Sequence, residues 1–403
     1  MKSSRLSLTF IALSFVLWGL LRSLDDIVIA LFQAADSMHF SVAMLVHSSF
    51  FSAYALVPLP AAILLRRKGY RFSLICACIF MAAGAAICVP GSGLHLFSLC
   101  LAGIFVVAAG IAVLQTCANP CIGLLGPPER AAARLLTLQS FSSCGSALGP
   151  IAGAWLFAVG LNPATRHVGF PSHQLASIYL TVFLLLLPLA WAIAKNFAEP
   201  RGSLGSASPG LWLAVVRRPR IAFAAAAMFL AVGVEATILG LTLRYLTILP
   251  QAHQTASEAS LLLAGYWILV LLGRLLAARL LRWISPRVLL ITSAVSGLLL
   301  VSVAVLQPGL AGGCCLLATG LFNATVPPTV FSLSVAGLRA SELAAVSGIL
   351  TTAICGGSVM PLAGGLIADQ LGYNFAFVLP ILSYLLLAAL AGRLTPAAVH
   401  PPR

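Results

Sequence analysis

The segment AEPRGSLGSASPGLW, from Ala198 to Trp212, is the longest polar interruption in a chain of 403 residues. Its glycine, serine and proline content is typical of a linker between helical regions. Long apolar runs of similar length lie before and after it. The segment therefore divides the protein into two comparable parts, and the apolar runs decide what those parts are.

The composition indicates which solvent surrounds the protein. Hydrophobic residues make up 61% of the chain, charged residues only 8%, and the mean hydropathy is +1.06. Soluble domains contain about 45–50% apolar and about 25% charged residues. Because so few charged side chains cannot cover a surface that faces water, most of the chain must lie in lipid. The sequence predicts a membrane protein.

The apolar runs have the length of membrane spans, since a transmembrane helix needs about 20 predominantly apolar residues. Twelve such runs occur: 6–34, 41–65, 72–90, 95–119, 132–159, 175–197, 220–248, 257–282, 287–306, 309–335, 343–368 and 372–393. Six precede the polar segment and six follow it. The sequence therefore predicts an all-α membrane protein of twelve transmembrane helices in two six-helix halves, residues 1–197 and 220–403, joined by a cytoplasmic linker at residues 198–219.

The Lys and Arg residues indicate the orientation of these helices. The formal net charge is +14, and most of the 23 Lys and Arg residues fall in short clusters between the apolar runs. If the N-terminus is cytoplasmic, nearly all of the clusters lie on the cytoplasmic side, as the positive-inside rule requires. We therefore predict a multi-pass protein of the cell inner membrane with both termini in the cytoplasm. Clusters of this kind argue against a nucleic-acid partner.

Motifs that would indicate an enzyme are missing from the sequence. There is no G-x-S-x-G, no H-E-x-x-H and no nucleotide-binding glycine loop. The ten cysteines lie in the predicted helices without the spacing of metal ligands, so we interpret them as packing residues. We expect no enzyme activity, no cofactor and no metal site. The expected partners are the lipid bilayer, a small solute and protons, and we expect a monomer.

The first predicted helix carries three charged residues, Arg22, Asp25 and Asp26. A charged side chain at the bilayer centre costs at least about 2.5–3.5 kcal/mol, so such groups are paired or functional. Either carboxylate is spaced to pair with Arg22 along one helix face. The two aspartates point about 100° apart, so one guanidinium does not neutralise both equally well. The alternative is a charge cluster near the outer helix end that reaches the interface by snorkelling.

Two amides, Gln115 and Asn119, lie four residues apart in the fourth predicted helix, directly before Pro120. This spacing places both on one helix face, where they suit a ligand rich in hydroxyl groups. The alternative is that they form hydrogen bonds between helices, which are common in membrane bundles.

Other polar residues also lie within the predicted helices: His47, Gln139, Glu235, Arg274 and Asn323. His47 has no partner at ligand spacing, and we interpret it as a packing residue rather than a proton relay. Arg274, near the inner end of the eighth helix, is better placed to clamp a cytoplasmic gate than to bind a substrate.

The twelve-helix, two-half plan resembles the major facilitator superfamily. Several strings resemble its fucose permease branch, the fucose/glucose/galactose–proton symporters. The most specific is AAGIAVLQTCANPCIGLLGPPERAAARLLTLQSFSSCGSALGP, residues 108–150. Similar likenesses are carried by FVLWGLLRSLDDIVIALFQ (15–33), GRLLAARLLRWISPRVLL (273–290), FNATVPPTVFSL (322–333) and CGGSVMPLAGGLIADQLGY (355–373). The resemblance extends over essentially the whole chain.

The resemblance implies roles for particular residues. Asp26 matches the family's proposed proton-coupling aspartate, and Gln115 falls where fucose permease has a glutamate involved in sugar binding and coupling. Glu235 falls where fucose permease has glutamine but other members have glutamate. The resemblance thus implies proton coupling at Asp26 and Glu235, and substrate binding by the polar residues that match its central cavity: Gln115, Asn119, Gln139 and Asn323.

The sequence also departs from the family pattern. Arg22 and Asp25 replace neutral amides, Ser142 stands in place of an asparagine, and Arg66 stands where the motif between the second and third helices has an aspartate. We interpret Arg22 and Asp25 as a structural charge pair that leaves Asp26 free to bind protons. The departures leave open a substrate other than fucose.

We therefore predict a secondary active transporter that takes up a sugar or similar polar solute with protons by alternating access. The alternative is an exporter, an antiporter of an amphipathic compound or drug. The added charges in the first helix and the missing aspartate of the inner loop would suit that function.

Overall fold

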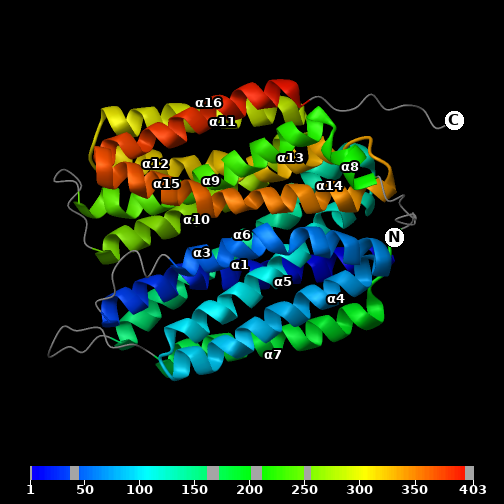
Figure 1. The fold of residues 1–403 in the computed structure, drawn as a ribbon, viewed down its shortest axis with the longest axis horizontal. Helices are drawn as coiled ribbons and strands as arrows, with labels where there is room; N and C mark the ends of the chain where they lie inside the picture. The colour runs from blue at the N-terminus through cyan, green and yellow to red at the C-terminus, as the bar shows by residue number, and fades with distance from the viewer. Residues whose placement is uncertain (1, 37–44, 161–171, 201–210, 249–255, 395–403) are drawn as a thin grey trace. The chain divides into compact units, whose positions relative to one another are not determined.

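The computed structural model describes residues 2–36, 45–160, 172–200, 211–248 and 256–394. Within these ranges the regular structure is helical and no strand occurs (Figure 1). The chain forms two compact units, Met1–Ala118 with Phe141–Pro200, and Asn119–Ser140 with Arg201–Arg403. The second unit includes residues 119–140, which belong to the predicted first half. The two units therefore reflect which segments pack together and do not coincide with the predicted halves. The division into residues 1–197, 198–219 and 220–403 stays a prediction.

The first unit is built from six helices, two of them in part. They are α1 (Lys2–Asp36), α3 (Leu45–Leu56), α4 (Pro58–Gly93), most of α5 (Phe97–Leu124), the greater part of α6 (Ala131–Gly160) and α7 (Ser172–Asn196). Helix α4 packs along α7, while α1 packs against both α3 and α7.

The second unit holds the adjoining ends of α5 and α6, the short helix between them and all helices after α7. These are η1 (Pro128–Arg130), α8 (Leu211–Val216), α9 (Pro219–Ile248), α10 (Ala256–Leu280), α11 (Pro286–Leu306), α12 (Leu310–Asn323), α13 (Val326–Val335), α14 (Ala340–Thr352), η2 (Ala353–Cys355), α15 (Gly356–Leu371), η3 (Tyr373–Phe377) and α16 (Val378–Arg393). Helix α9 packs against α15 and α16, and α11 packs against α12 and α16.

Ten helical segments of the described chain are long and apolar enough to cross a membrane, by length and composition. The two other predicted spans are also helical. The fifth coincides with α6, and the second corresponds to α3 with the first part of α4. Helix α4 therefore holds the end of the second span and the whole of the third. Gly69, with φ 81° and ψ 178°, separates the two. The twelve-helix prediction is confirmed.

Glycines let pairs of helices pack with their backbones in contact. A Cβ atom on Gly145 of α6 would lie 2.0 Å from the carbonyl oxygen of Val16 in α1. A Cβ atom on Gly356 of α15 would lie 2.2 Å from the carbonyl oxygen of Phe229 in α9. Each contact excludes any larger residue, and close approach of this kind is how helices associate in lipid.

The interruption of α4 at Gly69 is stabilised by a carboxylate that is distant in sequence but belongs to the same unit. Glu199, just after α7, accepts hydrogen bonds from the backbone N–H groups of Tyr70 (3.2 Å) and Arg71 (2.8 Å). These two N–H groups are in the first turn of the helical segment that follows Gly69. At that position no carbonyl group of the same segment can accept their hydrogen bonds. The related motif has an aspartate in this loop. Here Arg66 stands in its place, and Glu199 supplies the acid.

Replacing Glu199 with Ala should lower the free energy of unfolding by about 1 kcal/mol, the usual loss for a removed helix cap. The measurement is thermal unfolding of the purified protein in detergent. The matched control is Glu129→Ala, because Glu129 is also an exposed glutamate but lies in the short helix η1. Equal melting temperatures for the two variants would show that the Glu199 bonds contribute nothing.

Candidate functional site

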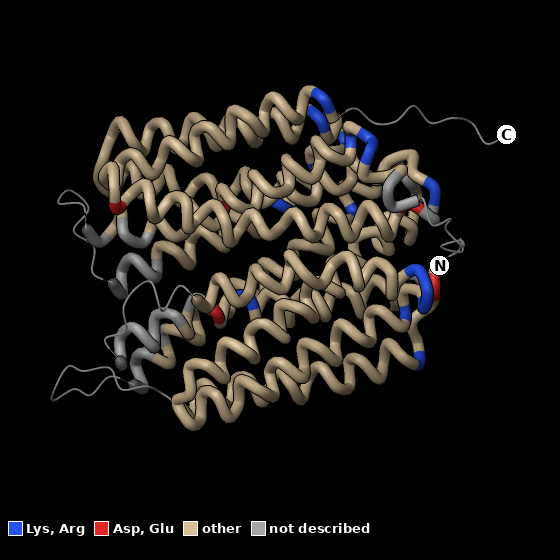
Figure 2. Tube along the Cα trace, in the orientation of Figure 1, with Lys and Arg blue, Asp and Glu red and all other residues tan. Residues whose placement is uncertain are grey.

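Charged residues are rare along the helices and frequent at their ends. Within each unit, Figure 2 shows Lys and Arg gathered near one end of its helices, with only isolated charged positions along their length. The isolated positions matter most for function, because a charge at membrane depth is maintained only where it is used or paired. Each unit contains one polar cluster of this kind, and the two are described in turn.

The cluster of the first unit joins α1, α3 and α5. The Gln115 side chain donates a hydrogen bond from Nε2 to the Tyr54 hydroxyl, 2.7 Å away, and both residues are buried. The guanidinium carbon of Arg22 lies 5.1 Å from the ring centroid of Phe50 and 5.7 Å from that of Phe51. Cations are attracted to aromatic faces at such distances. Helix α3 thus presents three aromatic rings to the polar residues of α1 and α5.

Asp25 belongs to the same cluster and is only 1% exposed. Both Asp25 and Arg22 act electrostatically on the Tyr54 hydroxyl, which places the three groups in one environment. The pairing of Arg22 with Asp25 stays a prediction. Asp26 follows in α1, but its side chain lies outside the described residues, so its predicted role in proton coupling is untested.

The two amides of α5 have different partners. Gln115 bonds to Tyr54 within the first unit, whereas Asn119 accepts a hydrogen bond from Gln139 Nε2 of α6, at 3.3 Å within the second unit. These are bonds between helices, as the alternative interpretation of the sequence expects. All three amide side chains are buried. A role in ligand binding stays a prediction for each of them.

The polar cluster of the second unit is centred on Asn323, the last residue of α12. The Tyr384 hydroxyl of α16 donates to Asn323 Oδ1 at 2.6 Å, and Asn323 Nδ2 donates to the Tyr266 hydroxyl of α10 at 3.5 Å. Glu235 of α9 acts electrostatically on both tyrosines. Three helices thus contribute to one buried group of polar side chains, and the partly buried Glu235 of a fourth helix acts on it electrostatically.

The tenth predicted span is broken beside this cluster. Helix α12 ends at Asn323 and α13 begins at Val326, followed by Pro327 and Pro328. Proline has no N–H to continue a helical hydrogen-bond ladder, which accounts for the break. Carbonyl groups near such a break need partners from elsewhere, because lipid supplies none.

Arg274 of α10 supplies one of these partners. It donates from Nε to the carbonyl oxygen of Ala324 at 3.4 Å, and from Nη1 to the carbonyl oxygen of Gln139 at 2.6 Å. It also interacts electrostatically with Glu235. Arg274 thus joins the backbone of α6 at Gln139 to the backbone of the α12–α13 break, one residue after Asn323.

The structure therefore brings four of the predicted site residues into one connected set: Asn119, Gln139, Glu235 and Asn323. Sequence reasoning missed Tyr266 and Tyr384, which satisfy Asn323, and Tyr54, which binds Gln115. Only Tyr54 could have been recognised from the sequence. It closes a short group of aromatic residues, Phe50, Phe51 and Tyr54, in a helix that also contains several serines. His47 lies in α3 and has interactions of its own. No group of residues that could hold a metal ion occurs in the part of the chain that the structure describes.

Comparison with known proteins identifies the family. A model of the Major Facilitator Superfamily matches residues 6–360. A glucose/galactose transporter of Brucella abortus is 31% identical over 390 residues, which cover 96% of this chain and 93% of the relative. The L-fucose-proton symporter of Escherichia coli is 28% identical over 379 residues, covering 89% and 86%. The chain belongs to the major facilitator superfamily.

The solved structures agree with this assignment. A crystal structure of the Escherichia coli fucose:proton symporter superposes with a TM-score of 0.83, at 25% sequence identity, and covers 98% of this chain and all of that one. The resemblance read from the sequence and the twelve-helix fold are both confirmed. The protein is thus a multi-pass membrane protein of a transporter family, and the exporter alternative is not favoured.

The Asn323 hydrogen bonds should differ in their contribution to stability. Tyr384→Phe removes the donor of a short bond between buried groups and leaves an amide oxygen unsatisfied, which costs about 1–3 kcal/mol. Tyr266→Phe removes only the acceptor of a long bond and should cost less. Thermal unfolding of both variants checks this. A larger loss in Tyr266→Phe would mean that Tyr384 is not the main partner of Asn323.

Proposed function

We propose that the protein imports a hexose-like sugar together with protons by alternating access. The observation that carries the proposal is the likeness to a glucose/galactose transporter over 96% of the chain. The likeness to an L-fucose-proton symporter supports the coupling to protons. Amides, which both donate and accept hydrogen bonds, suit the hydroxyl groups of a sugar. In this proposal Gln115, Asn119, Gln139 and Asn323 bind the substrate.

Asp26 and Glu235 are the proposed proton-coupling residues. A carboxyl group in a span is easily tolerated when neutral and costly when charged, so its proton can be exchanged only where water reaches it. Glu235 lies within electrostatic reach of Arg274, so its deprotonated form has a cation nearby. Asp26 is proposed on its match to the family's coupling aspartate.

The proposed orientation follows from the basic residues. The protein lies in the cell inner membrane as a monomer with both termini in the cytoplasm. Support comes from the positive-inside rule, because the Lys and Arg residues cluster in the loops that would then be cytoplasmic. The six-helix halves, residues 1–197 and 220–403, are the proposed moving bodies.

The test is uptake of radiolabelled glucose and galactose into proteoliposomes under an imposed, inwardly directed proton gradient. The wild-type protein should accumulate at least one of the two sugars. Asp26→Asn should abolish accumulation but keep exchange of labelled for unlabelled sugar, because asparagine mimics the protonated acid. Glu235→Gln should have the same effect if both carboxylates are needed.

Two outcomes would contradict parts of this proposal. If Asp26→Asn accumulates sugar as the wild type does, Asp26 is not the coupling residue, and Asp25 and Glu235 become the candidates. If the wild-type protein moves neither sugar nor any other hexose in either direction, the proposed substrate class is wrong.

Arg22 and Asp25 are proposed as a structural pair that maintains the first helix. Asp25→Asn would leave the Arg22 guanidinium without its carboxylate in a buried environment, which costs roughly 3–5 kcal/mol. The double variant Arg22→Asn/Asp25→Asn removes both charges and should recover much of that loss. Thermal unfolding of the three proteins provides the measurement. A double variant no more stable than Asp25→Asn would refute the pair.

A further inference from the structure

Four arginines and a tryptophan lie at neighbouring helix ends in the second unit. Arg279 is in the last turn of α10, Arg282 and Trp283 are in the turn that follows, Arg287 begins α11, and Arg393 ends α16. We call these five residues the arginine–tryptophan patch. Arg279, Arg282, Trp283 and Arg393 are exposed, and Arg287 is partly buried.

Hydrogen bonds fix the turn after α10 and join the start of α11 to the end of α16. The turn after α10 is closed by backbone bonds from Arg282 to Arg279 and from Trp283 to Leu280. Arg287 donates from Nη2 to the carbonyl oxygen of Gly392 at 2.6 Å, next to Arg393. The start of α11 is thus fixed beside the end of α16, and the patch is a defined surface rather than a set of separate charges.

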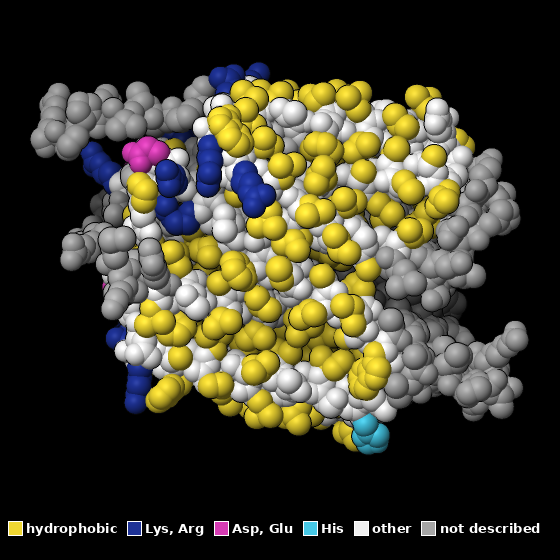
Figure 3. Space-filling model, turned by 180° about the vertical axis from the view of Figure 1, so that it is seen from behind, with side chains coloured by type: hydrophobic (Ala, Val, Ile, Leu, Met, Phe, Trp, Pro, Cys, Tyr) yellow, Lys and Arg dark blue, Asp and Glu magenta, His cyan; other side chains and the backbone are white. Residues whose placement is uncertain are grey.

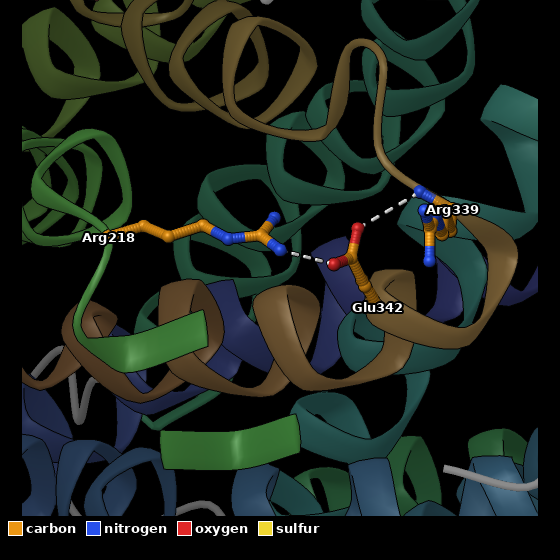
Figure 4. A network of polar contacts seen from close by, with 3 residues as sticks. All are labelled: Arg218, Arg339 and Glu342. Carbon is orange, nitrogen blue, oxygen red and sulfur yellow. Dashed lines mark hydrogen bonds and ion pairs between the residues drawn. The ribbon is translucent and has the colours of Figure 1, made fainter. Parts of the chain in front are cut away.

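No carboxylate neutralises the patch from its own helices. The sequence has no Asp or Glu between Glu258 and Glu342, and none after Asp369. Glu342, the next acid along the chain, interacts with other arginines, as Figure 4 shows. It pairs with Arg218 and accepts a hydrogen bond from the backbone N–H of Arg339 at 3.1 Å. The patch therefore carries a net positive charge that suits an anion from outside the protein.

The patch borders an apolar surface of the same helices. Trp283 is 77% exposed, and Leu275, Leu276 and Val288 beside it in the sequence are exposed large hydrophobic residues. Figure 3 shows Lys and Arg side chains gathered near one end of a face that is otherwise largely apolar. Exposed apolar residues on membrane helices face lipid, and tryptophan is enriched where lipid tails meet headgroups. The arginines are therefore at headgroup depth.

We propose that the arginine–tryptophan patch binds the phosphate headgroup of anionic phospholipids in the cytoplasmic leaflet. Arginine recognises phosphate through paired N–H donors, and several arginines near one membrane surface bind anionic lipids strongly. Trp283 contacts the acyl chains below the headgroup. The proposal rests on the proposed orientation of the protein in the membrane but not on its transport of a sugar.

The test compares spin-labelled phosphatidylglycerol with spin-labelled phosphatidylcholine on protein reconstituted in phosphatidylcholine vesicles. Electron paramagnetic resonance gives the protein-bound fraction of each lipid, with no sugar present. The test variant is Arg279→Gln/Arg282→Gln/Arg393→Gln. Arg287 is kept because its bond to Gly392 is structural. The control variant is Arg67→Gln/Lys68→Gln/Arg71→Gln, which removes the same charge from three exposed positions of the first unit.

The wild-type protein and the control variant should prefer phosphatidylglycerol. The test variant should lose this preference roughly tenfold or more, because each basic residue at an anionic surface strengthens binding by about fivefold. Replacing the same three arginines with lysine keeps the charge and should retain most of the preference. This variant also shows that the positions tolerate substitution, and thermal unfolding of each variant checks the fold.

Three results would overturn the proposal. An unchanged preference in the glutamine variant would mean that the patch binds no lipid. An equal loss in the test and control variants would mean a diffuse attraction to all basic loops. Loss of the wild-type preference on adding inorganic phosphate, but not chloride of equal ionic strength, would mean that the patch binds free phosphate instead of a lipid.

Discussion

The hydrocarbon core of a membrane offers no hydrogen-bond partner, and this constraint shapes the interior of both units. Every polar group at that depth must find its partner within the protein. Asn119 therefore pairs with Gln139, Gln115 with Tyr54, and Asn323 with Tyr384. These bonds connect different helices, so the few polar side chains also determine which helices lie together. Glycines such as Gly145 and Gly356 let the backbones approach closely enough for this to occur.

The two units accommodate a partly buried arginine by different means. In the first unit, Arg22 lies against the rings of Phe50 and Phe51, and Asp25 is nearby in the same helix. In the second unit, Arg274 donates to two backbone carbonyl groups. One of these carbonyls is at the break between α12 and α13, where proline has removed the regular helical pattern. The break and the arginine therefore depend on each other.

The helices could be predicted from the sequence because each membrane span is a continuous run of mostly apolar residues. The interruption of α4 at Gly69 falls in the basic loop between the predicted spans 41–65 and 72–90. The break between α12 and α13 was not predicted, because the apolar run 309–335 continues through it. The Asn119–Gln139 bond joins two helices, and spacing within one helix carries no information on it. Tyr266 and Tyr384 were missed because a tyrosine in an apolar run has the same pattern as a packing residue. The functional roles of the polar residues, Asp26 above all, stay predictions.

The partners of Arg274 bear on how a proton could control the second unit. An arginine whose only partner is a carboxylate becomes an unpaired buried charge when that carboxylate is protonated, which is strongly destabilising. Arg274 has other acceptors, because it donates to the backbone carbonyl groups of Gln139 and Ala324. Protonation of Glu235 then changes the electrostatic attraction on Arg274 without removing its hydrogen bonds. One of those bonds reaches α6 and the other reaches the α12–α13 break. If Glu235 couples protons as proposed, Arg274 connects it to both places. A residue held in this way can respond to a proton by a small shift, and the unit stays folded while it does so.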